Sequence, residues 1–172
     1  PPATTDAPDV AEVLFGDHEP EPVQLNTPES IRQLREADKG LFNPANNYAD
    51  LNFEADLLDM EPAERAAVAG EYRAMLADLG MSGDEAREAV GLLREHTREQ
   101  VPVETVKTWE AESHKRLQEM GANEADLTLA RTLVRRDPRI REILNITGLG
   151  SHPQIVQKFV ELARREKLRG RL

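Results

Sequence analysis

Few side chains in this sequence have the type and spacing that catalysis or metal binding requires. The 172 residues include four histidines and no cysteine, which excludes thiolate nucleophiles, zinc–thiolate sites and disulfides. His96 and Glu99 stand three residues apart, a spacing at which two helical side chains can bind one metal ion. Because there is no second such pair and no HExxH sequence, we expect a salt-bridged surface histidine and no metal site.

A glycine-containing segment near residue 150 is the second place where chemistry could be sought. Ser151 and His152 are adjacent, as a nucleophile and a base could be, but a serine shortly before Pro153 is more typical of a helix N-cap. Gly148 and Gly150 do not begin a dinucleotide-binding loop, because the third glycine is replaced by proline and no strand precedes them. We interpret the segment as a structural turn and expect no catalytic residue, no cofactor and no enzymatic activity. The turn comprises Thr147, Gly148, Leu149, Gly150, Ser151, His152 and Pro153.

Charge is distributed unevenly along the chain. The net charge is −10 over residues 1–60, −7 over 61–130 and +7 over 131–172. Such asymmetry favours an electrostatic partner for one end of the chain. The alternative is that the acidic and basic parts of the same chain attract each other.

The positive charge is concentrated at the C-terminal end. The candidate partner-binding residues there are Lys158, Arg164, Arg165, Lys167, Arg169 and Arg171. These cations could contact phosphates, but no aromatic residue is interleaved with them and the acidic remainder of the chain would repel a polyanion. We therefore predict a protein partner in preference to nucleic acid.

Hydrophobic period and capping residues predict an all-α protein of six or seven helices arranged as hairpins or a bundle. We expect helix starts at Thr27, Asp59, Ser82 (with Glu85), Pro102, Asn123, Asp137 and Ser151. Gly40, Gly80, Gly121 and Gly148 are the expected stops. No run of residues alternates as a strand would, and no apolar run approaches the 18 residues of a membrane-spanning helix.

Composition divides the chain into four predicted regions. Residues 1–27 form an acidic, proline-rich segment expected to be flexible; 28–58 a short helix and a loop; 59–121 a helical hairpin region; and 122–172 a helical region with a basic end. Only 39% of the residues are hydrophobic and 4% aromatic, which favours a thin core and an elongated shape. A thin core in turn suggests self-association, and we expect a homodimer or a higher oligomer.

The C-terminal third carries a recognisable pattern. Trp109 lies in one helix, an alanine-containing helix follows, and Thr147–Pro153 reads TGLGSHP before a short basic helix. This arrangement resembles the scaffolding or capsid-assembly proteins of tailed bacteriophages, clearly over 103–172 and faintly over 28–100. Ser151 stands where those proteins usually have asparagine, and either residue can cap a helix.

The resemblance implies a non-enzymatic head-assembly protein that guides procapsid formation in the host cytoplasm. It implies the major capsid protein as the partner, and under this hypothesis the cations of the last helix face an acidic surface of that protein. Phe159 and Leu162 would hold the helix against the turn. Two alternatives remain open: another phage structural protein, internal or connector-associated, and a helical DNA-associated adaptor.

Overall fold

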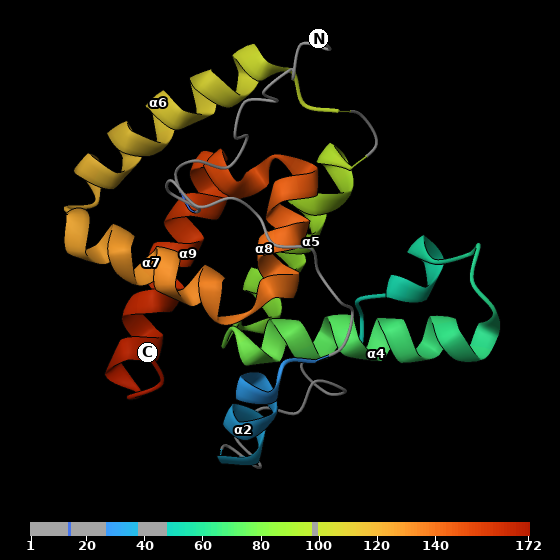
Figure 1. Ribbon diagram of the computed structural model, residues 1–172. Helices are drawn as coiled ribbons and strands as arrows, with labels where there is room; N and C mark the ends of the chain where they lie inside the picture. Colours follow the sequence, from blue (N-terminus) through green and yellow to red (C-terminus); the bar gives the residue numbers. More distant parts are fainter. Residues whose placement is uncertain (1–13, 15–26, 38–47, 98–99) are drawn as a thin grey trace, which may run out of the picture.

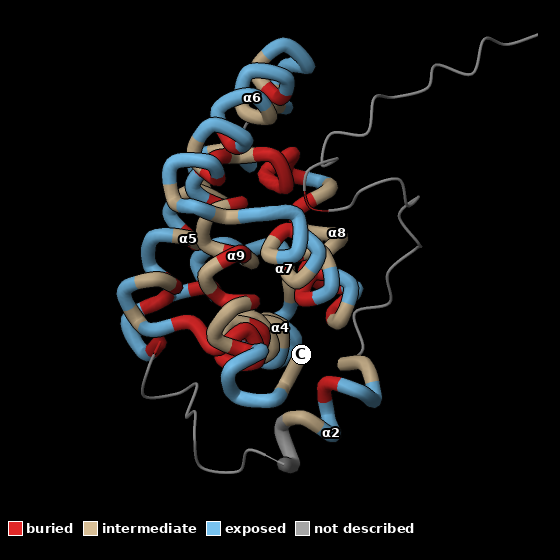
Figure 2. Tube along the Cα trace, turned by 90° about the vertical axis from the view of Figure 1, so that its left-hand side faces the viewer, coloured by how far each residue is buried: buried red, intermediate tan, exposed pale blue. Residues whose placement is uncertain are grey.

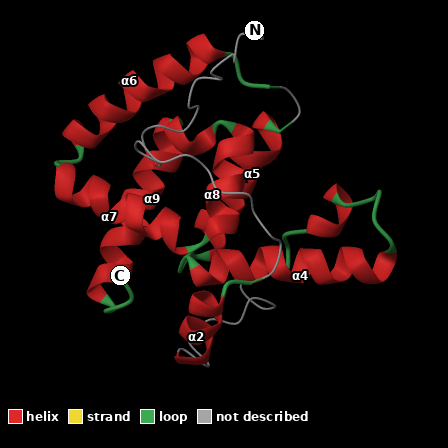
Figure 3. Ribbon diagram, in the orientation of Figure 1, coloured by secondary structure: helices red, strands yellow, loops and turns green. Residues whose placement is uncertain are grey.

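A computed structural model describes residues 14, 27–37, 48–97 and 100–172 (Figure 1). Its helices are α2 (Glu29–Ala37), α4 (Pro62–Asp78), α5 (Gly83–His96), α6 (Val103–Glu119), α7 (Glu124–Arg136), α8 (Pro138–Thr147) and α9 (Pro153–Leu168), with 3₁₀ turns η1 (Phe53–Asp56) and η2 (Leu149–Ser151). No strand occurs within these described ranges (Figure 3). The all-α prediction is confirmed.

Most helix ends are fixed by the residues expected to fix them. Ser82 and Glu85 form a capping box at the start of α5, and the Asp137 side chain accepts the backbone N–H of Arg139 at the start of α8. Gly80 and Gly148 have φ of 70°, a left-handed conformation in which a side chain would be strained. These local signals therefore set where α4, α5 and α8 begin or end.

Three expected helix ends differ from the structure. Helix α9 is capped by His152, whose Nδ1 accepts the backbone N–H of Gln154, and Ser151 instead lies within η2. Helix α2 begins at Glu29, so Thr27 lies one residue before the N-cap position, and its hydroxyl donates to the Glu71 carboxylate. Glu61 takes the N-cap position of α4 that Asp59 was expected to fill, without a side-chain hydrogen bond.

Helix α9 lies at the centre of the C-terminal region. It packs most extensively against α7 and next against α6. Buried positions in Figure 2 cluster on the inner faces of α9 and α7, whereas exposed positions run along α6. The α9 residues in the core are Ile155, Val156, Phe159, Val160, Leu162 and Ala163.

The same hydrophobic cluster continues into α4, α5 and the turn between them. Met75, Leu79 and Val90 are buried in it, and the Tyr48 hydroxyl donates a 2.6 Å hydrogen bond to the Met81 carbonyl oxygen. Burial raises the pKa of Tyr48 to about 12, so this donor keeps its proton. The regions expected at 59–121 and 122–172 thus contribute to one core. Of the expected acidic segment 1–27, all but residues 14 and 27 lies outside the described residues.

Candidate functional site

The turn from Thr147 to Pro153 is built as a rigid support for α9. The Thr147 hydroxyl donates to the Ile143 carbonyl oxygen at 2.7 Å, and Leu149, Gly150, Ser151 and Pro153 are all buried. From α6, the Ser113 hydroxyl donates to the Ser151 carbonyl oxygen at 2.7 Å. These contacts attach the start of α9 to both α8 and α6.

Ser151 and His152 do not form a nucleophile and base. The Ser151 hydroxyl is buried without a hydrogen-bond partner, and His152 Nδ1 is occupied by the Gln154 N–H. The His152 ring packs against the rings of Trp109 and His96, with centroids 4.7 and 5.5 Å away. Burial, followed by the charge of His96, lowers the pKa of His152 to about 4, so this ring is a neutral packing and capping group near pH 7.

His96 is the member of the His96 and Glu99 pair that the structure describes. His96 is the last residue of α5, and Glu99 lies outside the described residues. Across the residues that the structure describes, no group of three or more histidine, aspartate or glutamate side chains could hold a metal ion.

Two adjacent arginines of α9 reach the N-termini of two other helices. Arg164 Nε and Nη2 donate to both oxygens of Asp126 on α7, at 2.9 and 2.8 Å. Arg165 Nη2 donates to Glu85 on α5 at 2.8 Å. The arginine side chains are 37% and 39% exposed, so water reaches both ion pairs.

Both carboxylates also close the capping box of their own helix. Glu85 accepts the Ser82 N–H at 2.8 Å, and Asp126 accepts the Asn123 N–H at 3.0 Å. The hydrogen bond from Arg164, together with that from the Asn123 N–H, lowers the pKa of Asp126 to about 2. Burial opposes ionisation of Glu85, but the hydrogen bonds from Arg165 and the Ser82 N–H outweigh it and lower the pKa of this carboxyl below its usual value. Both acids are therefore ionised near pH 7.

Lys158 adds a second contact between α9 and α5. Its Nζ lies 3.7 Å from Glu85, 3.8 Å from Glu88 and 3.6 Å from Glu161 of its own helix. We name Glu85 and Asp126, which bind Arg165 and Arg164, the acidic cover of α9. Attraction between acidic and basic parts of one chain, kept as an alternative above, is thus realised in the fold.

Arg169 and Arg171 converge on a buried carboxylate. Glu166 is 1% exposed and lies 3.3 Å from Arg169, 2.8 Å from Arg171 and 2.9 Å from Arg136 of α7. Arg136 also donates to the Asp78 carbonyl oxygen at 2.8 Å, which joins α7 and α9 to the end of α4. Glu166 was not predicted as a structural residue. Its spacing from Ile155, Phe159 and Leu162 on one face of α9 is the sequence signal that marks it.

A second buried ionic cluster was also missed. Arg139 is 3% exposed and contacts Asp137 at 2.6 Å, Asp78 at 3.5 Å and Glu71. These residues come from α8, its N-cap and α4. The cluster fixes α8 against α4 by charge-assisted hydrogen bonds.

The last turn of α9 projects toward solvent. We name Lys167, Leu168 and Arg169 the C-terminal tip. Leu168 is 88% exposed, Lys167 is exposed, and the Arg169 side chain is 41% exposed even with its contact to Glu166. An exposed leucine between two cations has the chemistry to bind a surface that is both acidic and apolar.

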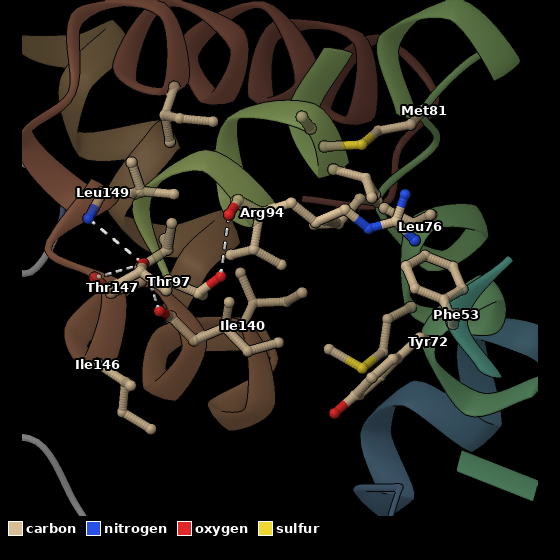
Figure 4. Close-up of a pocket in the computed structure, with 18 of the residues that line it drawn as sticks. Phe53, Tyr72, Leu76, Met81, Arg94, Thr97, Ile140, Ile146, Thr147 and Leu149 are labelled. Atoms are coloured by element: carbon tan, nitrogen blue, oxygen red, sulfur yellow. Dashed lines mark hydrogen bonds between the residues drawn. The ribbon is translucent and has the colours of Figure 1, made fainter. Parts of the chain in front are cut away.

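An apolar cleft opens between α4, α5 and α8 (Figure 4). It has a volume of about 410 Å³, and its lining includes Tyr72, Met75, Leu93, Ile143 and Phe159. Ile146 lies at its edge with 72% of its surface exposed. The lining is mainly hydrocarbon and includes one ion pair, between Asp56 and Arg94 at 2.6 Å, so the cleft suits apolar groups.

Comparison of the chain with protein-family models, with curated proteins and with solved structures found no match. Among the described residues, none of the helices has the length and apolar character needed to cross a bilayer.

Proposed function

We propose that this protein is a non-enzymatic head-assembly protein of a tailed bacteriophage. In this proposal it binds the major capsid protein in the host cytoplasm and guides procapsid formation. The observation that carries the proposal is the C-terminal tip, in which Leu168 is almost fully exposed between two cations at the end of a firmly held helix. The TGLGSHP turn, on which the resemblance to scaffolding proteins rests, fixes the start of this helix.

The cations of the basic end differ in how exposed they are and in which acids of the same chain they pair with. Three of the six predicted partner-binding cations, Lys158, Arg164 and Arg165, pair with acids of α5 and α7. Arg169 and Arg171 pair with Glu166 of α9 itself. Lys167, Leu168 and Arg169 are exposed, so first contact with a partner falls to them.

An ionic contact with one apolar anchor suits a protein that must bind and then leave. Exposed ion pairs are weak and are screened by salt, whereas a buried leucine contributes about 1.5–3 kcal/mol. The expected complex is therefore specific and reversible. Its affinity should fall with rising ionic strength.

Self-association is part of the proposal. The exposed Ile146 beside the apolar cleft and the exposed Leu58, 72% and 70% accessible, are the apolar side chains that a second copy would cover. Sedimentation equilibrium tests for the homodimer or higher oligomer, and a monomer at all concentrations would refute this part of the proposal.

Co-expression with the capsid protein of the same phage tests the main proposal. The full chain is expected to give uniform shells, and a variant carrying Lys167→Glu and Leu168→Asp is expected to lose both shell formation and capsid-protein binding. A control carrying Lys107→Glu and Val103→Asp reverses one charge and replaces one apolar side chain by an acid at exposed positions on α6. Uniform shells formed without this protein, or equally well with the tip variant, would refute the proposal.

The same preparation separates the alternatives. A scaffold should be absent from mature particles, whereas an internal or connector-associated component should remain in them. A DNA-associated adaptor should bind duplex DNA at low salt, with a loss of affinity in the tip variant.

A further inference from the structure

Arg164 and Arg165 already bind carboxylates of this chain, the same chemical group that an acidic partner surface would present to them. Each arginine donates to a carboxylate at 2.8 Å, and the two carboxylates belong to different helices, α7 and α5. Each carboxylate is also fixed by a backbone N–H of its own capping box, at 2.8 Å for Glu85 and 3.0 Å for Asp126. The acids are thus held in place by their own helices, and pairing costs little further side-chain entropy.

These pairs are open enough to exchange. The side chains of Arg164 and Arg165 are more than a third exposed, so a carboxylate arriving from solvent can reach them. The carboxylates of Asp126 and Glu85 are themselves 17% and 16% exposed, so each pair is partly buried and open to solvent mainly on the arginine side. By contrast, Glu166 is 1% exposed and its partners Arg136 and Arg171 are each 10% exposed, so a competitor from solvent does not reach these two pairs.

Resting on the function proposed above, we infer that the acidic cover is an autoinhibitory contact. Glu85 and Asp126 compete with the acidic surface of the partner for Arg164 and Arg165. The partner first meets the C-terminal tip and then gains these arginines only by displacing the two carboxylates. When the partner dissociates, Glu85 and Asp126, still held by their capping boxes, pair with the arginines again. Because the partner must break these two pairs in order to bind, they lower the affinity of the complex.

The test uses the full chain and a poly-L-glutamate probe, so that it does not depend on the capsid protein. A variant carrying Glu85→Gln and Asp126→Asn removes both competing charges, while its amide oxygens still accept the capping N–H groups. A control carrying Glu64→Gln and Glu112→Gln makes the same change in net charge at exposed positions on α4 and α6. Fluorescence anisotropy at low salt gives the affinity of each protein for the labelled probe.

We call the variant with Glu85→Gln and Asp126→Asn the cover variant. We expect it to bind the probe about three to ten times more tightly than the control, the range expected for releasing two partly exposed ion pairs. Adding Arg164→Gln and Arg165→Gln should abolish that gain. Equal affinity of the cover variant and the control would overturn the inference. So would a gain that survives removal of both arginines.

Folding and the proposed function are monitored separately. Circular dichroism sets a temperature at which every variant is folded, and the single Asp126→Asn variant, with about half the gain expected, supports the inference if the double variant is too unstable. Capsid-protein binding is measured in parallel. If the cover variant gains affinity for poly-L-glutamate but no variant binds the capsid protein, the proposed partner is refuted and the competition by Glu85 and Asp126 is established. If the capsid protein binds but the gain in affinity for poly-L-glutamate is missing, only the competition is overturned.

Discussion

Glu166 is a buried charged residue whose loss should strongly destabilise this fold. Its carboxylate is 1% exposed and pairs with Arg136 and Arg171, whose side chains are each 10% exposed, and with Arg169. Glu166→Gln keeps the volume of the side chain and removes its charge. Two buried guanidinium groups then lose their anionic partner.

The cost follows from the burial of the cluster. Removing one partner of a buried ion pair destabilises a protein by about 3–5 kcal/mol, because the remaining charge is desolvated and unpaired. The glutamine oxygen still accepts one hydrogen bond, so we expect a loss near the lower limit, about 3 kcal/mol. For a chain of this length, that corresponds to a fall in melting temperature of about 6–12 °C.

Thermal and urea unfolding followed by far-UV circular dichroism measures the effect. Glu88→Gln is the matched control, since Glu88 is 53% exposed and lies 3.8 Å from Lys158; it should cost less than about 1 kcal/mol. High salt should erase the small effect of the control and leave most of the effect of Glu166→Gln. Equal losses in the two variants would refute the argument that burial of the cluster decides its strength.

The remaining predictions concern the neutral histidine cap and the α4–α5 turn. Because the pKa of His152 falls from 6.5 to about 4 on folding, the unfolded chain binds more protons between these values and stability is lost as the pH falls through that window. We expect this histidine to account for a loss of about 2 kcal/mol between about pH 7 and about pH 5 in urea titrations. His152→Asn keeps a capping oxygen and should remove that loss, unlike His114→Asn at an exposed site; an unchanged pH dependence in the first variant would contradict the assignment. Gly80→Ala should cost about 2 kcal/mol, since φ is 70° and the added Cβ would lie 2.7 Å from Arg169 Nη1 and 3.1 Å from Glu166 Oε1. Gly121→Ala, with φ of 65° and nothing within 4 Å of its Cβ, should cost only about 1 kcal/mol, and equal costs would show that the contact to Glu166 is unimportant.

Helix boundaries could be predicted where the deciding contacts are local. The capping boxes at Ser82 and Asn123 each join residues three apart, and Asp137 caps α8 through a contact two residues away. Such contacts depend on a few neighbouring residues, so the pattern in the sequence is sufficient. The predicted start of α9 was wrong by one residue. Ser151 lies in η2 because its carbonyl oxygen accepts a hydrogen bond from the hydroxyl of Ser113 in another helix.

The sequence by itself determined the all-α class, most of the helix ends and the basic character of α9, because period, caps and charge are properties of short stretches of chain. The tertiary structure alone decided which charges meet. Arg165 pairs with Glu85, 80 positions earlier in the chain, and Arg164 with Asp126, 38 positions earlier. Each of these pairings depends on how α5, α7 and α9 pack together, and packing is decided by the fit of whole apolar faces. For that reason the sequence predicted a basic end available to a partner, whereas the fold leaves exposed mainly its last turn.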